Sequence, residues 1–88
     1  MSRITDIWKA TGKGTPFVIV QANIEGTVRY YSFKVAAERL TEIKLHSYRF
    51  LDSGNSDITR FHEVEGKTLQ WFIDNGYKVE RVWRDRRA

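Results

Sequence analysis

The side chains with the clearest chemical potential are arginines that alternate with aromatic residues along extended segments of the chain. An arginine can pair with a phosphate through two N–H donors, and an aromatic ring can stack on a nucleobase. The residues that we assign to such a surface are Arg29, Arg49, Arg60, Lys78, Arg81, Trp83, Arg84, Arg86 and Arg87. The pattern predicts a surface that binds nucleic acid or another partner.

The positive charge is densest near the C-terminus. Residues 78–87 contain five Lys or Arg side chains and only two acidic ones, while the whole chain carries a net charge of +4. A basic surface is typical of proteins that bind nucleic acid. A charge of +4 is also ordinary for a soluble domain, so charge alone does not assign the function.

A segment in the first half of the chain resembles part of a known DNA-binding fold. Residues 27–38, TVRYYSFKVAAE, are similar to the last strand and helix start of DNA-binding domains of the GCC-box and integrase arm-binding type. In those domains a three-stranded sheet enters the major groove, and a Phe and an Ala-rich helix brace it from behind. The resemblance implies such a sheet within residues 3–44 if residues 4–10 form a strand.

Glu65-Gly66-Lys67, with Asp57 upstream, has the E-x-K spacing of restriction-like nucleases. In those enzymes carboxylates hold Mg²⁺ and a lysine polarises the attacking water. The segment 69–79 also resembles the helix-Gly-Tyr-strand ending of small phage-type nuclease domains. There the E-x-K lies on a strand, whereas here it falls at the start of a predicted helix. We therefore predict a non-enzymatic protein without catalytic residues, and keep a small metal-dependent nuclease as a remote alternative.

The chain has few residues that could hold a metal or a cofactor. It has no cysteine, and its two histidines are His46 and His62, whereas a transition-metal site needs three or four ligands. Residues 12–15, GKGT, resemble a phosphate loop, but they precede a strand instead of opening a helix. We predict a hairpin loop there, and neither a metal nor a cofactor.

The length and composition predict one packed domain over residues 1–88 with a short basic tail at 84–88. The chain is 41% hydrophobic and 14% aromatic, which is far from the composition of disordered proteins. It shows no signal peptide and no apolar run that could cross a membrane. We therefore expect an intracellular, cytoplasmic protein without a membrane partner.

Hydrophobic periodicity predicts an α+β fold, in the order β-β-β-α-β-β-α-β. An antiparallel sheet of about four to five strands would carry two helices on one face. The predicted strands are 3–10, 17–22, 27–33, 46–51, 58–62 and 77–83, and the predicted helices are 34–44 and 65–75. The first element is uncertain, because Ile4, Ile7 and Trp8 also fit a helical stripe; we favour a strand. Gly76 predicts the end of the second helix.

The same periodicity predicts which side chains are buried. The helices should bury Leu40, Leu69, Phe72 and Ile73. One face of the last strand should carry Tyr77, Val79, Arg81 and Trp83. The other face should carry Lys78, Glu80 and Val82.

Two functions from different classes follow from this reading. The first is a non-enzymatic nucleic-acid or polyanion binder that uses an Arg/aromatic sheet face and the basic C-terminus. The alternative is a protein-binding accessory inhibitor or regulator of the phage or mobile-element type, and a homodimer is also open. Arginines gathered on one exposed face would favour nucleic acid, whereas an apolar patch around Trp8 or Trp83 would favour a protein partner.

Overall fold

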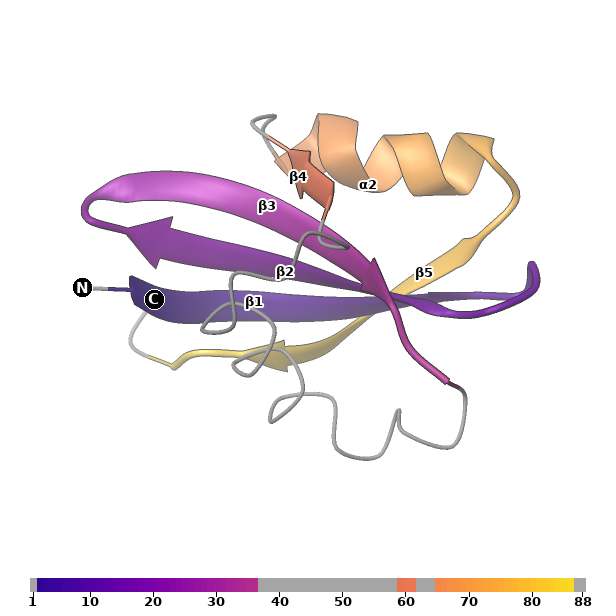
Figure 1. Cartoon of the computed structure of the whole chain (residues 1–88), viewed down its shortest axis with the longest axis horizontal. Helices are drawn as coiled ribbons and strands as arrows, with labels where there is room; N and C mark the ends of the chain where they lie inside the picture. Colours follow the sequence, from indigo (N-terminus) through magenta and orange to yellow (C-terminus); the bar gives the residue numbers. More distant parts are fainter. Residues whose placement is uncertain (1, 37–58, 62–64, 87–88) are drawn as a thin grey trace.

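The computed structural model describes residues 2–36, 59–61 and 65–86. These residues form a five-stranded antiparallel sheet in the order β4-β3-β2-β1-β5 and one α-helix, which lies along one side of the sheet (Figure 1). The elements are β1 (Ser2–Thr11), β2 (Phe17–Ile24), β3 (Thr27–Lys34), β4 (Thr59–Phe61), α2 (Glu65–Asp74) and β5 (Lys78–Arg84).

The prediction of an α+β fold with two helices packed on the sheet is wrong. The described residues are mostly antiparallel sheet with a single short helix. Lys34, where the first helix was expected to begin, ends β3, and the Val35 N–H donates to the Pro16 carbonyl at 3.1 Å. Phe33 and Val35 are buried in one cluster at the two-residue spacing of a strand, so the extended backbone continues to Val35. The rest of that predicted helix, with Leu40, and the predicted strand 46–51 lie outside the described residues.

β2 is the central strand, as its unbroken apolar run predicts. It pairs with β1 along one edge and with β3 along the other. Val18, Val20 and Ile19 are all fully buried, although Ile19 points to the face opposite to the two valines. A strand that is buried on both faces reads as continuous hydrophobic sequence because neither face alternates with solvent.

The turn between β2 and β3 has two residues, Glu25 and Gly26, both with positive φ (52° and 86°). Two positive φ values are what a type I′ hairpin turn requires. The Asn23 side chain closes the turn, because its Oδ1 accepts a hydrogen bond from the Gly26 N–H at 2.9 Å.

β1 is a strand, which confirms the prediction that we favoured for the first element. Its pairing with β2 is irregular between Ile4 and Asp6, so that Thr5 is an extra residue in β1. Because of this bulge, Ile4 and Ile7 lie in the same buried cluster although they are three residues apart. The bulge explains why the apolar spacing of this segment also fitted a helix.

β5 pairs with β1 and has a second bulge. Trp8 lies opposite Arg81 and Ile7 lies opposite Trp83, so Val82 is the extra residue. Trp83 therefore packs with the Ile7 cluster, while Val79 packs against the cluster that contains Trp8. The prediction that Trp83 shares a face with Val79 and Arg81 is wrong, because strict alternation does not hold across a bulge.

The sheet separates two hydrophobic clusters. We call the face that contacts α2 the helix-side face, and the other the opposite face. The helix-side cluster contains Trp8, Ala10, Ile19, Tyr30 and Phe72. The cluster on the opposite face contains Ile4, Ile7, Val18, Val20, Ala22, Phe33 and Val35.

α2 packs on the sheet through Phe72, which is 1% exposed and lies with its ring centroid 5.4 Å from that of Phe17. Leu69, which was expected to be almost fully buried, is partly buried. Ile73 was predicted to face the core, but it is 50% exposed, and Thr68 is buried in its place. Thr68 and Phe72 are four residues apart and therefore share one face of the helix.

The end of α2 is where Gly76 predicts it. Gly76 has a φ of 91°, its N–H donates to the Ile73 carbonyl, and the Tyr77 N–H donates to the Phe72 carbonyl at 3.0 Å. These two bonds form a Schellman motif. The Lys13 ammonium from the β1–β2 loop donates to the Asn75 carbonyl at 2.8 Å, so a cation also sits at the negative end of the helix dipole.

Replacing Phe72 by Ala should lower the free energy of unfolding by about 3–5 kcal/mol, because it leaves a cavity between helix and sheet. Ile73→Ala, one residue further along the same helix, should cost less than about 1 kcal/mol because its side chain is half exposed. Urea unfolding followed by circular dichroism measures both. Equal losses would mean that the helix packs in a different phase.

Gly76→Ala should destabilise the protein by about 1–2 kcal/mol, because an alanine is strained at this positive φ. An added Cβ would meet only the Lys13 Cδ, at an ordinary 3.5 Å, so the cost is one of backbone conformation and not of a clash. Gly76→Asn should cost less, since asparagine tolerates the left-handed region better than alanine. Thermal unfolding of the three proteins compares them, and an alanine variant as stable as the asparagine variant would contradict this account.

Candidate functional site

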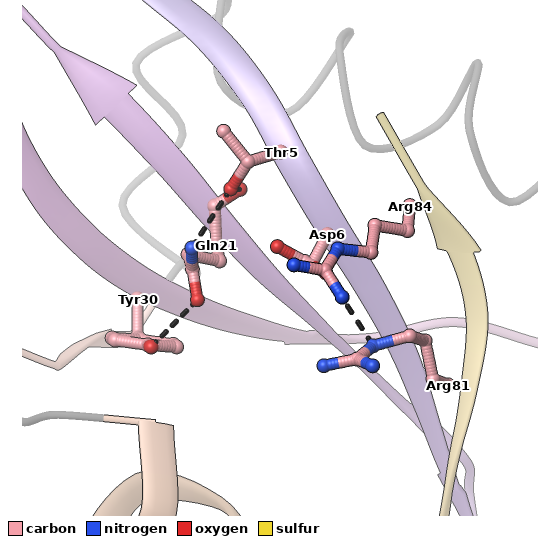
Figure 2. A network of polar contacts seen from close by, with 6 residues as sticks. All are labelled: Thr5, Asp6, Gln21, Tyr30, Arg81 and Arg84. Carbon is pink, nitrogen blue, oxygen red and sulfur yellow. Dashed lines mark hydrogen bonds and ion pairs between the residues drawn. The ribbon is translucent and has the colours of Figure 1, made fainter. Parts of the chain in front are cut away.

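A network of polar side chains lies on the helix-side face, across β3, β2, β1 and β5. Its members are Thr5, Asp6, Gln21, Tyr30, Arg81 and Arg84, and Figure 2 shows them in two groups. Tyr30 joins the network to the hydrophobic cluster under α2. The network is therefore continuous with the core between the sheet and α2.

The first group is a chain of hydrogen bonds that crosses three strands. The Tyr30 hydroxyl donates to Gln21 Oε1 at 2.6 Å, and Gln21 Nε2 donates to Thr5 Oγ1 at 2.9 Å. The Thr5 hydroxyl in turn donates to the Gln21 carbonyl at 3.3 Å. Thr5 is the bulged residue of β1, and the bulge places its hydroxyl within reach of Gln21. The chain fixes the orientation of the amide through both of its ends.

The second group is a buried carboxylate shared by two arginines. Asp6 Oδ1 lies 3.4 Å from Arg81 Nε and 3.7 Å from Arg84 Nε. The Asp6 side chain is only 7% exposed, whereas those of Arg81 and Arg84 are 40% and 60% exposed. Asp6 Oδ1 receives no hydrogen bond from the described residues, so its charge is balanced by the approach of the two guanidinium groups. The negative charge is enclosed and the positive charge reaches solvent.

The bulge in β5 creates this arrangement. Residues 81 and 84 are three apart, and in a regular strand they would point to opposite faces. The extra residue Val82 brings both arginines to the face of Asp6. Arg81 also lies over the ring of the buried Trp8, with its guanidinium carbon 5.3 Å from the ring centroid. A cation–π contact of this kind holds the guanidinium plane in place.

A second buried carboxylate lies next to the network. Asp85 directly follows β5; its side chain pairs with Arg3, with Nε 3.2 Å from Oδ2, and its N–H donates to the Thr5 carbonyl at 2.8 Å. Arg86 follows it and is exposed.

We call Arg3, Arg81, Arg84 and Arg86 the arginine cluster. Three of these arginines pair with the two buried carboxylates, Asp6 and Asp85, and the fourth, Arg86, is exposed. The arrangement can bind an anion, because each guanidinium presents several N–H donors to solvent-side ligands.

The structure brings together only some of the residues that the sequence assigned to a binding surface. Arg81 is the middle residue of β5, Arg84 is its last residue, and the exposed Arg86 follows the strand. Trp83 packs on the opposite face, and Arg29, opposite Ala22, belongs to that face as well. Lys78 lies at the other end of β5, opposite Thr11.

Of the remaining predicted residues, Arg49, Arg60 and Arg87, the structure describes only Arg60. Arg60 lies in β4, opposite Tyr31 of β3. Arg49 and Arg87 lie outside the described residues, as do His46 and His62. The predicted partner of residues 58–62 was the segment before them, but the described residues 59–61 pair with β3.

The sequence reasoning missed Asp6, Asp85 and Arg3. The available signal was an acidic residue inside the apolar run Ile4–Trp8, where a buried charge requires a partner. Trp8 was considered as an exposed patch, but it is 3% exposed and lies under Arg81. Trp83 is partly buried, so neither tryptophan forms a bare apolar surface.

The segments that resemble a nuclease motif and a phosphate loop lie at the start of α2 and between β1 and β2. α2 begins at Glu65, which confirms that Glu65 and Lys67 lie at the start of a helix. Residues 12–15 lie between β1 and β2, as predicted for a hairpin loop. In the described ranges no group of three or more His, Asp or Glu side chains is placed to hold a metal ion. Nor does this part of the chain include a helix long and apolar enough to span a membrane.

Comparisons with known proteins assign no family to this chain. No family model matches it, and no curated protein or solved structure shows significant similarity to it.

Tyr30→Phe should lower the free energy of unfolding by about 1–2 kcal/mol, because it leaves the part-buried Gln21 Oε1 without its donor. Tyr31→Phe is the matched control, since Tyr31 is the next residue and points to the opposite face. In a double-mutant cycle, Gln21→Met should remove most of the effect of Tyr30→Phe. Additive losses in that cycle would show that the hydrogen-bond chain does not couple the two residues.

Proposed function

We propose that this domain is a non-enzymatic binding protein for polyanions, that nucleic acid is its ligand, and that the arginine cluster contacts the phosphates. The single observation that carries the proposal is the direction of the charges. Asp6 and Asp85 are buried, while the guanidinium groups that pair with them reach solvent. A ligand that approaches this surface meets the guanidinium groups before the carboxylates.

The ion pairs do not remove this surface from consideration. Arg81 and Arg84 keep 40% and 60% of their side-chain surface exposed, although both approach Asp6. Arginine suits phosphate because its planar donors match two phosphate oxygens at once. The proposal is consistent with the excess of Lys and Arg over residues 78–87.

The structure changes how such binding would work. Trp8 and Tyr30 are buried, so these two rings of the helix-side face are not available to stack on bases. The proposed contacts are therefore with the sugar–phosphate backbone, which carries no sequence information. A ligand inside the cell agrees with the predicted cytoplasmic location, which remains part of the proposal.

Wild-type protein should bind a 20-base-pair DNA duplex with an affinity that falls steeply with salt. Each phosphate contact contributes a slope of about −0.9 in log K against log salt, because counterions are released. Changing Arg81, Arg84 and Arg86 together to Gln should flatten the slope by up to about three units. Fluorescence anisotropy at several salt concentrations measures both the affinity and the slope.

The control for net charge is a comparison of Arg84→Gln with Lys34→Gln. Each removes one positive charge, but Lys34 is an exposed residue at the end of β3, beside Phe17. Arg84→Gln should weaken binding and flatten the slope more than Lys34→Gln does. Equal effects would mean that the protein binds through its overall charge and not through the arginine cluster.

A protein partner is the second candidate, and two exposed apolar side chains of α2 favour it. Trp71 and Ile73 are 49% and 50% exposed, and large apolar side chains are enriched where proteins bind one another. Under this alternative the domain is an accessory inhibitor or regulator. Wild-type protein that shows no salt-dependent binding to DNA or RNA at low salt would favour this candidate over the first.

A further inference from the structure

We infer that Asn75 is a self-modification site, at which deamidation converts the side-chain amide to a carboxylate, and that the cap at the end of α2 holds this site unreactive. Asn75 is followed by Gly76. Glycine is the neighbour that favours the reaction most, because it has no side chain to hinder the approach of its nitrogen to the asparagine amide. The inference does not involve the arginine cluster, so it is tested independently of the proposed function.

The reaction needs no partner other than water. The backbone nitrogen of Gly76 attacks Cγ of Asn75, so that a bond forms between these two atoms and the bond from Cγ to Nδ2 breaks. Nδ2 leaves as ammonia and takes the proton that the Gly76 nitrogen loses. Water then opens the cyclic imide at one of its two carbonyl groups. One product has an aspartyl residue at position 75, and the other has an isoaspartyl residue, which adds a carbon atom to the main chain.

The first argument is that the attacking nitrogen is already engaged. The Gly76 N–H donates to the Ile73 carbonyl at 3.1 Å, as part of the Schellman motif that closes α2. This hydrogen bond stabilises the proton that the nitrogen must lose, and it directs the nitrogen toward the helix. Gly76 itself is exposed to solvent. The hydrogen bond therefore protects the site, and exclusion of water does not.

The second argument is that the amide under attack is held as well. Asn75 Nδ2 donates to the Trp71 carbonyl at 2.7 Å. The Asn75 N–H donates to the carbonyls of Trp71 and Phe72, at 3.1 and 3.2 Å. Both the side chain and the backbone of Asn75 are thus bonded to the preceding turn of α2, whereas the attacking nitrogen belongs to the residue that follows. The cap must open before Cγ and this nitrogen can react.

The third argument is that a residue distant in sequence closes the same site. The Lys13 ammonium donates to the Asn75 carbonyl at 2.8 Å. The loop between β1 and β2, which carries Lys13, lies at the same end of the molecule as the end of α2 (Figure 1). The Asn75 carbonyl and the Gly76 nitrogen belong to one peptide group. Lys13 therefore restrains the reacting peptide group from the side of the sheet, while the Schellman motif restrains it from the side of the helix.

The modification would prevent the helix end from closing again in the same way. Both products lack the Nδ2–H that donates to the Trp71 carbonyl. Both also place a negative charge at the C-terminal end of the helix dipole, where it is unfavourable. The isoaspartyl product lengthens the link between Phe72 and Tyr77, whose ring centroids lie 5.6 Å apart. One opening followed by reaction thus weakens the contact between α2 and the sheet permanently.

Peptide mapping of aged wild-type protein tests the inference. One sample is kept folded at mildly alkaline pH, another is unfolded in guanidinium chloride at the same pH, and both are then digested with trypsin. The peptide of residues 68–78 contains Asn75 and no other asparagine. Its deamidation, measured by mass spectrometry, should be at least about tenfold slower in the folded sample, because the reaction requires the cap to open. Equal rates in the two samples, or no reaction in the unfolded one, would overturn the inference.

Asn23 is the internal control in the same samples. It is followed by Ile24, whose branched side chain hinders attack by its nitrogen. Asn23 should therefore remain unmodified in both samples while Asn75 reacts in the unfolded one. Equal modification of both asparagines in the unfolded sample would contradict a site that Gly76 makes reactive.

Lys13→Gln tests whether the cap controls the rate. It should speed deamidation of Asn75 in the folded protein about two- to fivefold, because it removes one hydrogen bond from the cap. Lys9→Gln is the matched control, since Lys9 pairs with the exposed Glu80 at 3.7 Å and its loss removes the same charge from the same hairpin. It should leave the rate at the wild-type value, and in guanidinium chloride all three proteins should react equally. Equal rates in the two folded variants, or a slower reaction in Lys13→Gln, would overturn the inference.

Discussion

The register of β1 against its two neighbours is the constraint on which the rest of the structure depends. β1 is bulged at Thr5 against β2, and β5 is bulged at Val82 against β1. Each bulge reverses the face on which the following residues lie. Without the first, Ile4 and Ile7 would not share a hydrophobic cluster. Without the second, Arg81 and Arg84 would not meet at one carboxylate. The hydrophobic core and the polar network are consequences of the same two irregularities.

The network in turn stabilises the register. A shift of β1 by one residue against β2 would move Asp6 to the opposite face, next to Val18 and Val20. An unpaired carboxylate in such surroundings is costly, so the misaligned pairing is disfavoured. The Tyr30–Gln21–Thr5 chain acts in the same way, because a shift would leave a part-buried amide without partners. Polar groups and apolar groups therefore select the same alignment of strands.

The sequence predicted the elements better than the faces. Local sequence patterns predicted the central position of β2 and the end of α2 before Gly76. They also predicted the strands that the structure has at 2–11, 27–34 and 78–84. Bulges leave no such local mark, so strict alternation placed Trp83 on the wrong face. Phe72 was found by helical periodicity, but Ile73 was not placed correctly, because the phase of a short helix depends on what it packs against. The first helix was predicted to begin at Lys34, but Lys34 ends β3. Phe33 and Val35 are buried together at the spacing of a strand, which outweighs the helical propensity of this segment. Of the candidate site, the sequence indicated Arg81 and Arg84 because they lie in a basic segment, but not Asp6, which is distant in sequence.

The presence of Asp6 needs an explanation beyond stability. A domain of 88 residues has a thin core, and a charged residue on an interior strand uses a position that an apolar side chain could fill. Replacing a buried ion pair by apolar residues is often neutral or stabilising, so the pair is weak evidence for a stabilising role. A role in register would be met by a single arginine opposite Asp6, since one guanidinium neutralises one carboxylate. Here two arginines approach the carboxylate, so Asp6 connects β1 to two positions of β5, one on each side of the bulge at Val82.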